Sequence, residues 1–224
     1  MKMKQKLIAG AIALSAMAGF AVPAAHAEVS AAVGAANMYY WRGLDLGAGD
    51  PQIWGDLKVS GGGAYAGIWA GSGDAAMGQE YDLYAGYGNT VGDFKFDISV
   101  WSYSYPKPSA TAELVDGEIE YVSADPLSPG DLVEAVVMVG YGPIAFTYYE
   151  NLEGAEDYNY MTLAGTFGDF TVKYGVHEDD LSHVDLTYAF NSKLSFTIGK
   201  VVDDVDGAYN DEAKFVVGFA LPIE

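Results

Sequence analysis

Hydrophobic residues alternate with small or polar residues on both sides of the dipeptide Gly168-Asp169. Met161, Leu163 and Phe167 precede it, and the run 170–176 follows it with the same period of two. Strict alternation on both sides of a two-residue turn predicts a β-hairpin. One face of this hairpin is apolar and the other carries polar side chains. The pattern alone leaves open whether the apolar face meets a protein core or lipid.

The same alternation recurs along the chain and predicts an all-β fold of twelve strands. The high counts of tyrosine and glycine, 17 and 28, agree with strands that are separated by turns. No linker or low-complexity tract divides the strands, so residues 28–224 are expected to form one domain. The predicted strands cover 29–41, 51–60, 64–71, 79–88, 93–104, 132–142, 143–150, 157–167, 169–177, 182–190, 193–201 and 213–223.

The connections between the predicted strands alternate in length. Those after even-numbered strands are tight turns such as SGGG, GP and GD, whereas those after odd-numbered strands are longer and polar or acidic. The longest is the 27-residue stretch 105–131. This sorting is typical of a transmembrane barrel, in which short turns face the periplasm and long loops face outward. The pattern therefore predicts a closed antiparallel outer-membrane β-barrel, because hydrocarbon cannot satisfy the backbone groups of a free strand edge.

Charged residues fall on the strand positions opposite to the apolar rows. Rows such as Val133 to Tyr141 and Val184 to Phe190 would face lipid. Charges in the middle of a strand are costly in a dry core but are tolerated in a wet lumen. The predicted pore-lining residues are Asp56, Lys58, Glu80, Asp82, Lys95, Asp97, Glu134, Lys173, His177, His183, Asp185 and Lys214.

The first 27 residues have the pattern of a secretory signal. Three lysines lie within the first six residues, the run 7–20 is apolar, and Ala25-His26-Ala27 fits a small-x-small cleavage site. The apolar run is shorter than the ~20 residues that a membrane-spanning helix needs. We therefore expect residues 1–27 to be a cleaved signal peptide and the mature chain to begin at Glu28.

The predicted mature chain is strongly acidic and lacks cysteine. Without the three signal lysines, eight basic residues stand against 31 acidic ones, a formal charge of −23. Such a surface repels nucleic acid and offers no basic patch to phosphates, so we expect no nucleic-acid partner. The absence of cysteine excludes disulfides, thiolate chemistry and cysteine-bound zinc.

Four aromatic-rich stretches follow one another in the order NMYYWRGLDLGAGDPQIWG, GAYAGIWAG, EYDLYAGY and SYSYP. In this order and spacing they resemble the TorF-like family of outer-membrane porins, which shares an aromatic-x-x-Arg-Gly hairpin and a Glu-Tyr-Asp-hydrophobic strand. The likeness is strongest over residues 29–105. The sequence departs from the family at Met38, at Asp45 and in its Pro-Ile-Glu C-terminus, where the family has Asp, Ser and an aromatic residue. The resemblance implies a barrel with porin-like function.

Arg42-Gly43 carries part of this resemblance and lies at the end of the first predicted strand. There, Arg42 would lie at the extracellular mouth of the barrel. It would either pair with acidic loop residues or a passing anion, or fix the first loop as a structural residue. We favour the structural role.

Two acidic segments contain residue types that can bind metal ions. His177 and His183 flank EDDLS, but their spacing matches no metal signature. The segment DDVDGAYND resembles an EF-hand loop at its centre, yet Val202 and Ala213 occupy the two outer ligand positions. We therefore predict neither a specific metal site nor a cofactor, and only weak divalent binding by acidic loops.

Serine and histidine residues do not form a catalytic pair in the predicted strands. Ser182 and His183 are adjacent and would point to opposite faces of a strand. Ser195 shares the side of His183, but the hairpin between them places it far away along the strand. Without a nucleophile next to a base, we predict that the protein is not an enzyme.

The predicted activity is passive, porin-like diffusion of small hydrophilic solutes. Eight strands enclose an interior filled by side chains, whereas 16–18 leave a wide channel, so twelve should give a narrow or partly plugged pore. Acidic outer loops would attract cations and give a modest cation preference. The expected partners are outer-membrane lipid and lipopolysaccharide, the barrel-assembly machinery during insertion, and small solutes.

Two other interpretations of the pattern remain open. A non-conducting barrel would display acidic loops for adhesion or for divalent-bridged contact with lipopolysaccharide. The stretch 105–131 would then be a binding surface or a plug folded inward. A soluble periplasmic β-sandwich or β-barrel that binds a ligand is the other interpretation, and the alternation of loop lengths argues against it.

Overall fold

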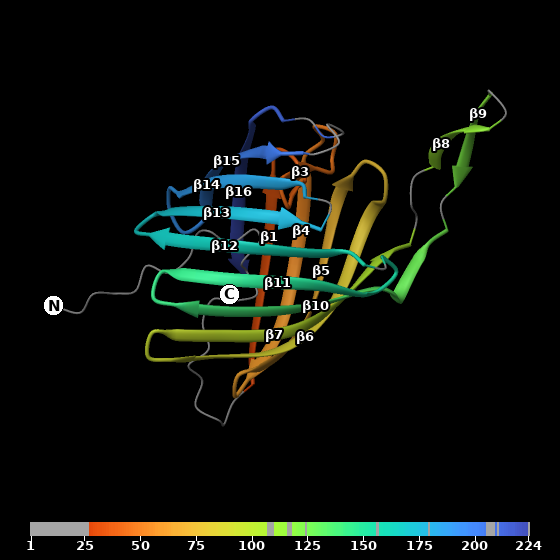
Figure 1. Ribbon diagram of the computed structural model, residues 1–224. Helices are drawn as coiled ribbons and strands as arrows, with labels where there is room; N and C mark the ends of the chain where they lie inside the picture. Colours follow the sequence, from red (N-terminus) through yellow and green to blue (C-terminus); the bar gives the residue numbers. More distant parts are fainter. Residues whose placement is uncertain are drawn as a thin grey trace.

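The protein forms a closed barrel of twelve antiparallel strands (Figure 1). The computed structural model describes residues 27–223 except 107–109, 116–117, 124, 156, 179, 205–208 and 210. Among the residues described, there is no helix that is long and apolar enough to cross a membrane. The barrel strands are β1 (Glu28–Ala36), β4 (Gln52–Gly61), β5 (Ala64–Asp74), β6 (Gly78–Val91), β7 (Phe94–Tyr105), β10 (Leu127–Tyr141), β11 (Ile144–Glu153), β12 (Asn159–Phe167), β13 (Phe170–His177), β14 (Ser182–Ala189), β15 (Leu194–Asp203) and β16 (Lys214–Ile223).

The barrel closes because the first strand pairs along both of its edges. On one side β1 is antiparallel to β16, with Val33 opposite Leu221, and on the other to β4, with Val33 opposite Gly55. The other neighbours follow chain order, except that β7 pairs with β10. Each described barrel strand therefore has a partner on both sides, and the sheet exposes no unpaired edge.

All twelve predicted strands are confirmed, with shifts of a few residues at their ends. The two largest shifts are equal: the first strand, which was predicted to reach residue 41, ends at Ala36, and the strand predicted to begin at residue 132 begins at Leu127. Asn37 ends the pairing: its Nδ2 donates to the carbonyl of Phe215 at 2.9 Å, and its Oδ1 accepts the backbone N–H of Val217 at 2.6 Å. These bonds replace further ladder bonds between β1 and β16.

The predicted alternation of connection lengths holds except at two connections: 75–77 is nearly as short as the turns on either side of it, and 178–181 is no longer than 190–193, the turn that follows β14. Two-residue turns at one end of the barrel occupy 62–63, 92–93, 142–143 and 168–169. The connection predicted from GSGDAAMG is reduced to 75–77, because β5 and β6 extend into it. Asp74 closes this short turn by accepting the backbone N–H groups of Ala76 and Met77 at 2.8 and 2.7 Å.

The stretch 105–131, predicted as one long loop, contains a separate β-hairpin. β8 (Ala110–Val115) pairs with β9 (Glu118–Ser123), and β10 already begins at Leu127. Figure 1 shows this hairpin, in green, extending beyond the end of the barrel. The hairpin therefore lies outside the ring of strands.

The outer and inner surfaces of the barrel differ in the way that the alternation predicts. In β12 and β13 the outward residues are apolar and exposed, such as Leu163 at 53% and Val172 at 47%. The alternate residues Thr162 and Thr171 are buried. The other strands repeat the arrangement, so the outer surface is rich in exposed large apolar side chains and the inner surface is polar.

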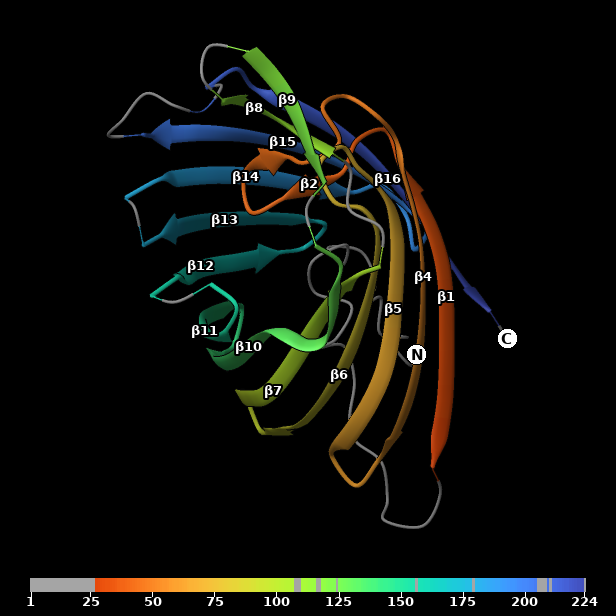
Figure 2. The ribbon, with the colours of Figure 1, turned by 90° about the vertical axis from the view of Figure 1, so that its right-hand side faces the viewer.

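The first connection, residues 37–51, folds into the interior of the barrel. Two short strands, β2 (Tyr40–Trp41) and β3 (Leu44–Asp45), form a hairpin within it. Figure 2 shows β2 enclosed by the ring of barrel strands. Tyr39 is only 7% exposed, and its hydroxyl donates to the carboxylate of Glu80 in β6. We call residues 37–51 the first loop.

Candidate functional site

The tip of the first loop directs Arg42 at the inner wall. Trp41 pairs with Leu44, and the two residues between them have positive φ angles, 46° at Arg42 and 89° at Gly43. Glycine adopts this left-handed conformation freely, whereas arginine rarely does and pays an energetic cost. Contacts of the Arg42 side chain must offset this cost.

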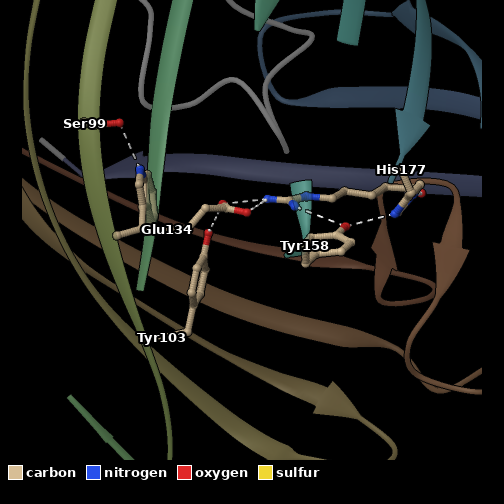
Figure 3. Close-up of polar contacts among 7 residues, drawn as sticks. Ser99, Tyr103, Glu134, Tyr158 and His177 are labelled. Atoms are coloured by element: carbon tan, nitrogen blue, oxygen red, sulfur yellow. Dashed lines mark hydrogen bonds and ion pairs between the residues drawn. The ribbon is translucent and has the colours of Figure 1, made fainter. Parts of the chain in front are cut away.

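Arg42 forms a buried ion pair with Glu134 of β10 (Figure 3). Its Nη2 lies 2.8 Å from Oε1 and 2.7 Å from Oε2 of the carboxylate. Tyr103 of β7 donates its hydroxyl to Oε2 at 2.8 Å. The two charged side chains are 8% and 3% exposed. Removing one partner of such a buried pair costs about 3–5 kcal/mol, since the remaining charge is left unpaired.

Aromatic rings surround the guanidinium group of Arg42. The distance from its Cζ to the ring centroid is 4.4 Å for both Trp41 and Tyr149, 4.7 Å for Tyr160 and 5.8 Å for Tyr158. A cation within about 6 Å of a ring face is attracted by the ring quadrupole. Trp41 belongs to the first loop, whereas the three tyrosines belong to β11, to β12 and to the connection between them. The rings and the carboxylate together enclose one cation.

His177 joins the backbone of the first loop to this group of rings. Its Nε2 donates to the carbonyl oxygen of Arg42 at 2.8 Å, because a carbonyl can only accept. In the neutral imidazole Nδ1 is then the acceptor, and it takes the hydroxyl of Tyr158 at 2.9 Å. The Tyr158 oxygen accepts from Nη1 of Arg42 at 3.3 Å, so that Arg42, His177 and Tyr158 form a closed ring of hydrogen bonds (Figure 3). Both the backbone and the side chain of Arg42 are therefore fixed.

A second group of side chains holds Tyr40. Oδ1 of Asp185 accepts the Tyr40 hydroxyl at 2.5 Å and Nδ1 of His183 at 2.9 Å, and Oδ2 lies 2.9 Å from Nζ of Lys173. Nε2 of His183 is 2.7 Å from the hydroxyl of Tyr160. Because Tyr160 also lines the site of the guanidinium, the two groups form one continuous network.

Three glycines leave the space that these contacts need. A Cβ atom at Gly199 of β15 would lie 1.9 Å from the hydroxyl of Tyr40. At Gly175 of β13 it would lie 2.3 Å from Nε2 of His183, and at Gly43 it would lie 2.6 Å from Cγ of the same ring. Gly199 and Gly43 therefore permit the close approach of the loop to the wall, and Gly175 permits the close packing of His183 and Tyr160 within the wall.

The loop residues are held in the protonation states that these bonds require. Burial disfavours the charge on Arg42, but the carboxylate of Glu134 outweighs this effect and raises the pKa of the guanidinium. Burial, reinforced by the charge of Asp185, raises the pKa of Tyr40 far above its ordinary value. Burial and Glu80 do the same to the pKa of Tyr39. Both hydroxyls therefore remain hydrogen-bond donors at neutral pH.

Two tyrosine–carboxylate pairs line the interior nearer the end with the two-residue turns. Tyr84 donates to Oδ2 of Asp56 at 2.8 Å, and Tyr65 donates to Oδ1 of Asp97 at 2.7 Å. The Nζ of Lys58 lies 6.0 Å from the ring centroid of Tyr65, and its charge is attracted to both carboxylates. The interior thus remains polar beyond the first loop.

Ten of the twelve predicted pore-lining residues fall into three groups in the structure. Those around the first loop tip are Glu134, Lys173, His177, His183 and Asp185. Those near the start of the loop are Glu80 and Asp82, and those nearer the short turns are Asp56, Lys58 and Asp97. Two residues lie at the periphery, Lys95, which is exposed and donates to the carbonyl of Gly142 at 3.2 Å, and the half-buried Lys214.

Arg42 does not lie at the end of a barrel strand, as the sequence pattern had suggested. Because the first strand ends at Ala36, Arg42 belongs to the hairpin that returns into the interior. Its partner is Glu134 of the barrel wall instead of an acidic loop residue. Of the two predicted roles, this geometry fits the structural one, in which Arg42 fixes the first loop.

Sequence reasoning missed the tyrosines that complete the site. Tyr149 and Tyr160 lie opposite each other in the ladder of β11 and β12, on the positions that alternate with outward residues. Their inward direction could have been read from the alternation. Tyr40 gave no such signal, because its partner Asp185 is 145 positions away in the sequence.

His177 and His183 do come together, with ring centroids 6.2 Å apart. Each nitrogen described above is engaged with a tyrosine, a carbonyl or Asp185. In the described part of the chain, no group of three or more His, Cys, Asp or Glu residues could hold a metal ion. Asp179, and residues 205–208 of the segment compared with an EF-hand, lie outside the described residues.

A protein-family model matches most of the chain. The family is described as "Bacterial protein of unknown function (Gcw_chp)", and the match covers residues 20–190. This span contains the first loop, Glu134 and all the residues that hold Tyr40. A search of curated proteins found no match.

Proposed function

The chain belongs to the Gcw_chp family, and we propose that it is an outer-membrane channel for small hydrophilic solutes, narrowed by its first loop. The observation that carries the proposal is the inverted polarity of a closed barrel. Large apolar side chains cover the outside, and carboxylates, histidines and lysines line the inside. A closed sheet satisfies its own backbone groups, as hydrocarbon requires.

The outer surface favours lipid over water as its surroundings. Exposed apolar residues recur on successive strands, for example Leu83 on β6, Ile98 on β7 and Val137 on β10. Contiguous apolar patches of this kind are rare on soluble monomers. A soluble ligand-binding barrel would have the opposite arrangement, with polar residues outside and an apolar interior.

Two further features support the channel over a sealed barrel. The aromatic-x-x-Arg-Gly segment resembles the TorF-like porins, and in this chain it forms the first loop. Among the described residues, the loop is attached to the wall by hydrogen bonds and by the ion pair of Arg42 with Glu134. Such attachments can exchange with water or solute, so the loop would act as a constriction.

The interior charges support a preference for cations. Six of the predicted lining residues are acidic, Asp56, Glu80, Asp82, Asp97, Glu134 and Asp185. Five of these, all but Asp56, are buried against the barrel interior with less than 6% exposure, and the formal charge of the chain is −20. A negative field raises the local concentration of cations at the entrance.

Membrane fractionation followed by conductance measurement tests this proposal. We expect the protein in the outer-membrane fraction, with a gel mobility that changes on boiling, and small single-channel steps in planar bilayers. The absence of a mobility shift would contradict the membrane barrel. A shift without any conductance would contradict the channel.

The β8–β9 hairpin favours a second function, the display of a binding surface. It extends beyond the barrel end instead of folding into the lumen (Figure 1). Deleting residues 107–124 distinguishes the two functions. A channel should conduct as before, whereas a display protein would lose surface attachment of cells and show no conductance in either form.

A further inference from the structure

The group that surrounds Arg42 belongs mainly to the barrel wall. Glu134 lies on β10, Tyr149 on β11 and Tyr160 on β12, which are neighbours in the sheet. Strand register fixes their relative positions, with Tyr149 opposite both Val136 and Tyr160. The first loop contributes only Trp41 to the rings. The wall would therefore keep most of this group in place if the loop withdrew.

The chemistry of this group fits a guanidinium ion in particular. One nitrogen, Nη2, contacts both oxygens of Glu134 while a second, Nη1, contacts the Tyr158 hydroxyl, and two nitrogens of one planar, delocalised cation can reach both acceptors at once. Aromatic faces at 4.4 to 5.8 Å attract it further, and the Tyr158 oxygen accepts from a second nitrogen. A compact ammonium ion can use the charge of Glu134, but it cannot span these acceptors and stack on the rings at once.

Arg42 occupies this group of side chains with a strained backbone, and a free ligand bound there would not have this energetic cost. The Arg42 backbone is in the left-handed region, with φ at 46°. Withdrawal of Arg42 would relieve this strain but would leave the buried carboxylate of Glu134 without a cation, which is unfavourable. A guanidinium solute supplies that cation without the strained backbone.

We propose that Glu134, Tyr149, Tyr158 and Tyr160 form a binding site for small guanidinium compounds on the inner wall, with Arg42 as its built-in occupant. A solute bearing a guanidinium group displaces Arg42 and thereby releases the first loop. This inference rests on the proposed channel function and names the substrate class that opens it.

Binding to the detergent-solubilised full-length protein tests the site without any need for conduction. We expect Arg42→Ala to bind methylguanidinium by titration calorimetry at least tenfold more tightly than methylammonium. Adding Glu134→Gln should weaken methylguanidinium binding at least tenfold, because a charge-assisted contact is lost. Adding Glu150→Gln instead, at an exposed carboxylate, should leave binding unchanged. Equal binding of the two cations, or no loss with Glu134→Gln, would overturn the site.

A second measurement uses the wild-type protein in case Arg42→Ala does not assemble. Methylguanidinium should accelerate hydrogen exchange of the backbone amides in residues 39–45 at least threefold, whereas methylammonium at equal ionic strength should not. Unchanged exchange with both cations would overturn the displacement. A barrel that binds methylguanidinium but never conducts would contradict the channel and leave the site intact. A conducting barrel that does not bind it would contradict only the site.

Discussion

At the scale of single residues, the buried pair of Arg42 and Glu134 determines where the first loop lies. The pair stabilises the loop only while both charges are present. Each group is almost fully removed from water, so neither can be solvated in place of its partner. The Tyr103 hydroxyl donates to the carboxylate of Glu134, and His177 donates to the backbone carbonyl of Arg42 and so helps to position its side chain.

Replacing Glu134 with glutamine should destabilise the docked loop by about 3–5 kcal/mol, because the guanidinium of Arg42 would remain buried without its counter-charge. The measurement is the rate of hydrogen exchange in residues 39–45, together with single-channel conductance, which should rise. The control is Glu150→Gln, whose exposed carboxylate accepts a hydrogen bond from Tyr148 and takes no part in holding Arg42. An equal effect of both substitutions would contradict the role given to the buried pair.

A second residue-scale prediction concerns the space beside Tyr40. Gly199→Ala should expel the Tyr40 hydroxyl from Asp185, because the new Cβ would lie 1.9 Å from it. The backbone amides of the first loop should then exchange hydrogen faster. In a Tyr40→Ala background, where the ring is absent, Gly199→Ala should have no further effect on this rate. Gly55→Ala is the matched control, since its nearest neighbour would be an ordinary contact at 3.8 Å. Additive effects of Gly199→Ala and Tyr40→Ala would show that the two positions do not compete for space.

At the scale of elements, successive residues of the hairpin formed by β12 and β13 point alternately to the outer and to the inner surface of the barrel. Val172 pairs with Leu186 across the ladder, and both are exposed on the outer surface. Lys173, the next residue, pairs with Asp185 on the inner surface. Adjacent positions should therefore respond differently to substitution.

Val172→Lys should reduce the yield of assembled barrel. For a lipid-facing position near the middle of the bilayer, lysine lowers the free energy of unfolding by about 2–4 kcal/mol. Lys173→Gln should reduce it much less, since Asp185 keeps its bonds from Tyr40 and His183. The yield is measured as the fraction of protein whose gel mobility changes on boiling. Comparable losses for the two variants would mean that the faces are assigned the wrong way round.

The first loop should be sensitive to alkaline pH. The pKa values of Tyr39 and Tyr40 are raised in the docked loop by burial and by Glu80 and Asp185, whereas in a released loop they return to about their ordinary value of 10.0. The stabilisation of the docked loop by these protonated hydroxyls is thus fully present below pH 10 and is progressively lost as the pH rises above it. Hydrogen exchange or conductance from pH 8 to 11.5 measures this loss. The double variant Tyr39→Phe/Tyr40→Phe should show a shallower dependence, and an unchanged slope would exclude these hydroxyls as its cause.

At the scale of the whole molecule, an apolar outer surface and an acidic interior are combined in one closed sheet. The net charge does not influence how the strands pair, but in the proposed channel it would determine which ions approach the entrance. The open conformation should therefore favour cations, and this preference should weaken with salt.

Reversal potentials in a KCl gradient should show selectivity for K⁺ over Cl⁻ near 0.1 M salt. The preference should fall markedly near 1 M, because the screening length shortens from about 10 Å to about 3 Å. Anion selectivity at low salt would contradict the proposed role of the lining carboxylates. A selectivity that does not change with salt would place its origin in short-range contacts instead.

The alternation of side chains along the sequence determined most of the barrel. Pairs such as Leu163 and Tyr174, or Val172 and Leu186, follow directly from a period of two and from short turns. The inner and outer faces followed in the same way, because burying one face of a strand fixes the environment of every second residue. These are local properties, and the sequence contains them in full.

Only the tertiary structure decided the position of the first loop and the composition of its site. Arg42 meets Glu134 across 92 positions, and Tyr40 meets Asp185 across 145. The aromatic run around them alternates well enough to continue a strand, and nothing local shows that it turns inward after Asn37. The reason is physical: inside a closed barrel, the buried charged and polar groups of the loop must find partners on the inner wall. Which partners are available depends on strand order and register around the whole ring.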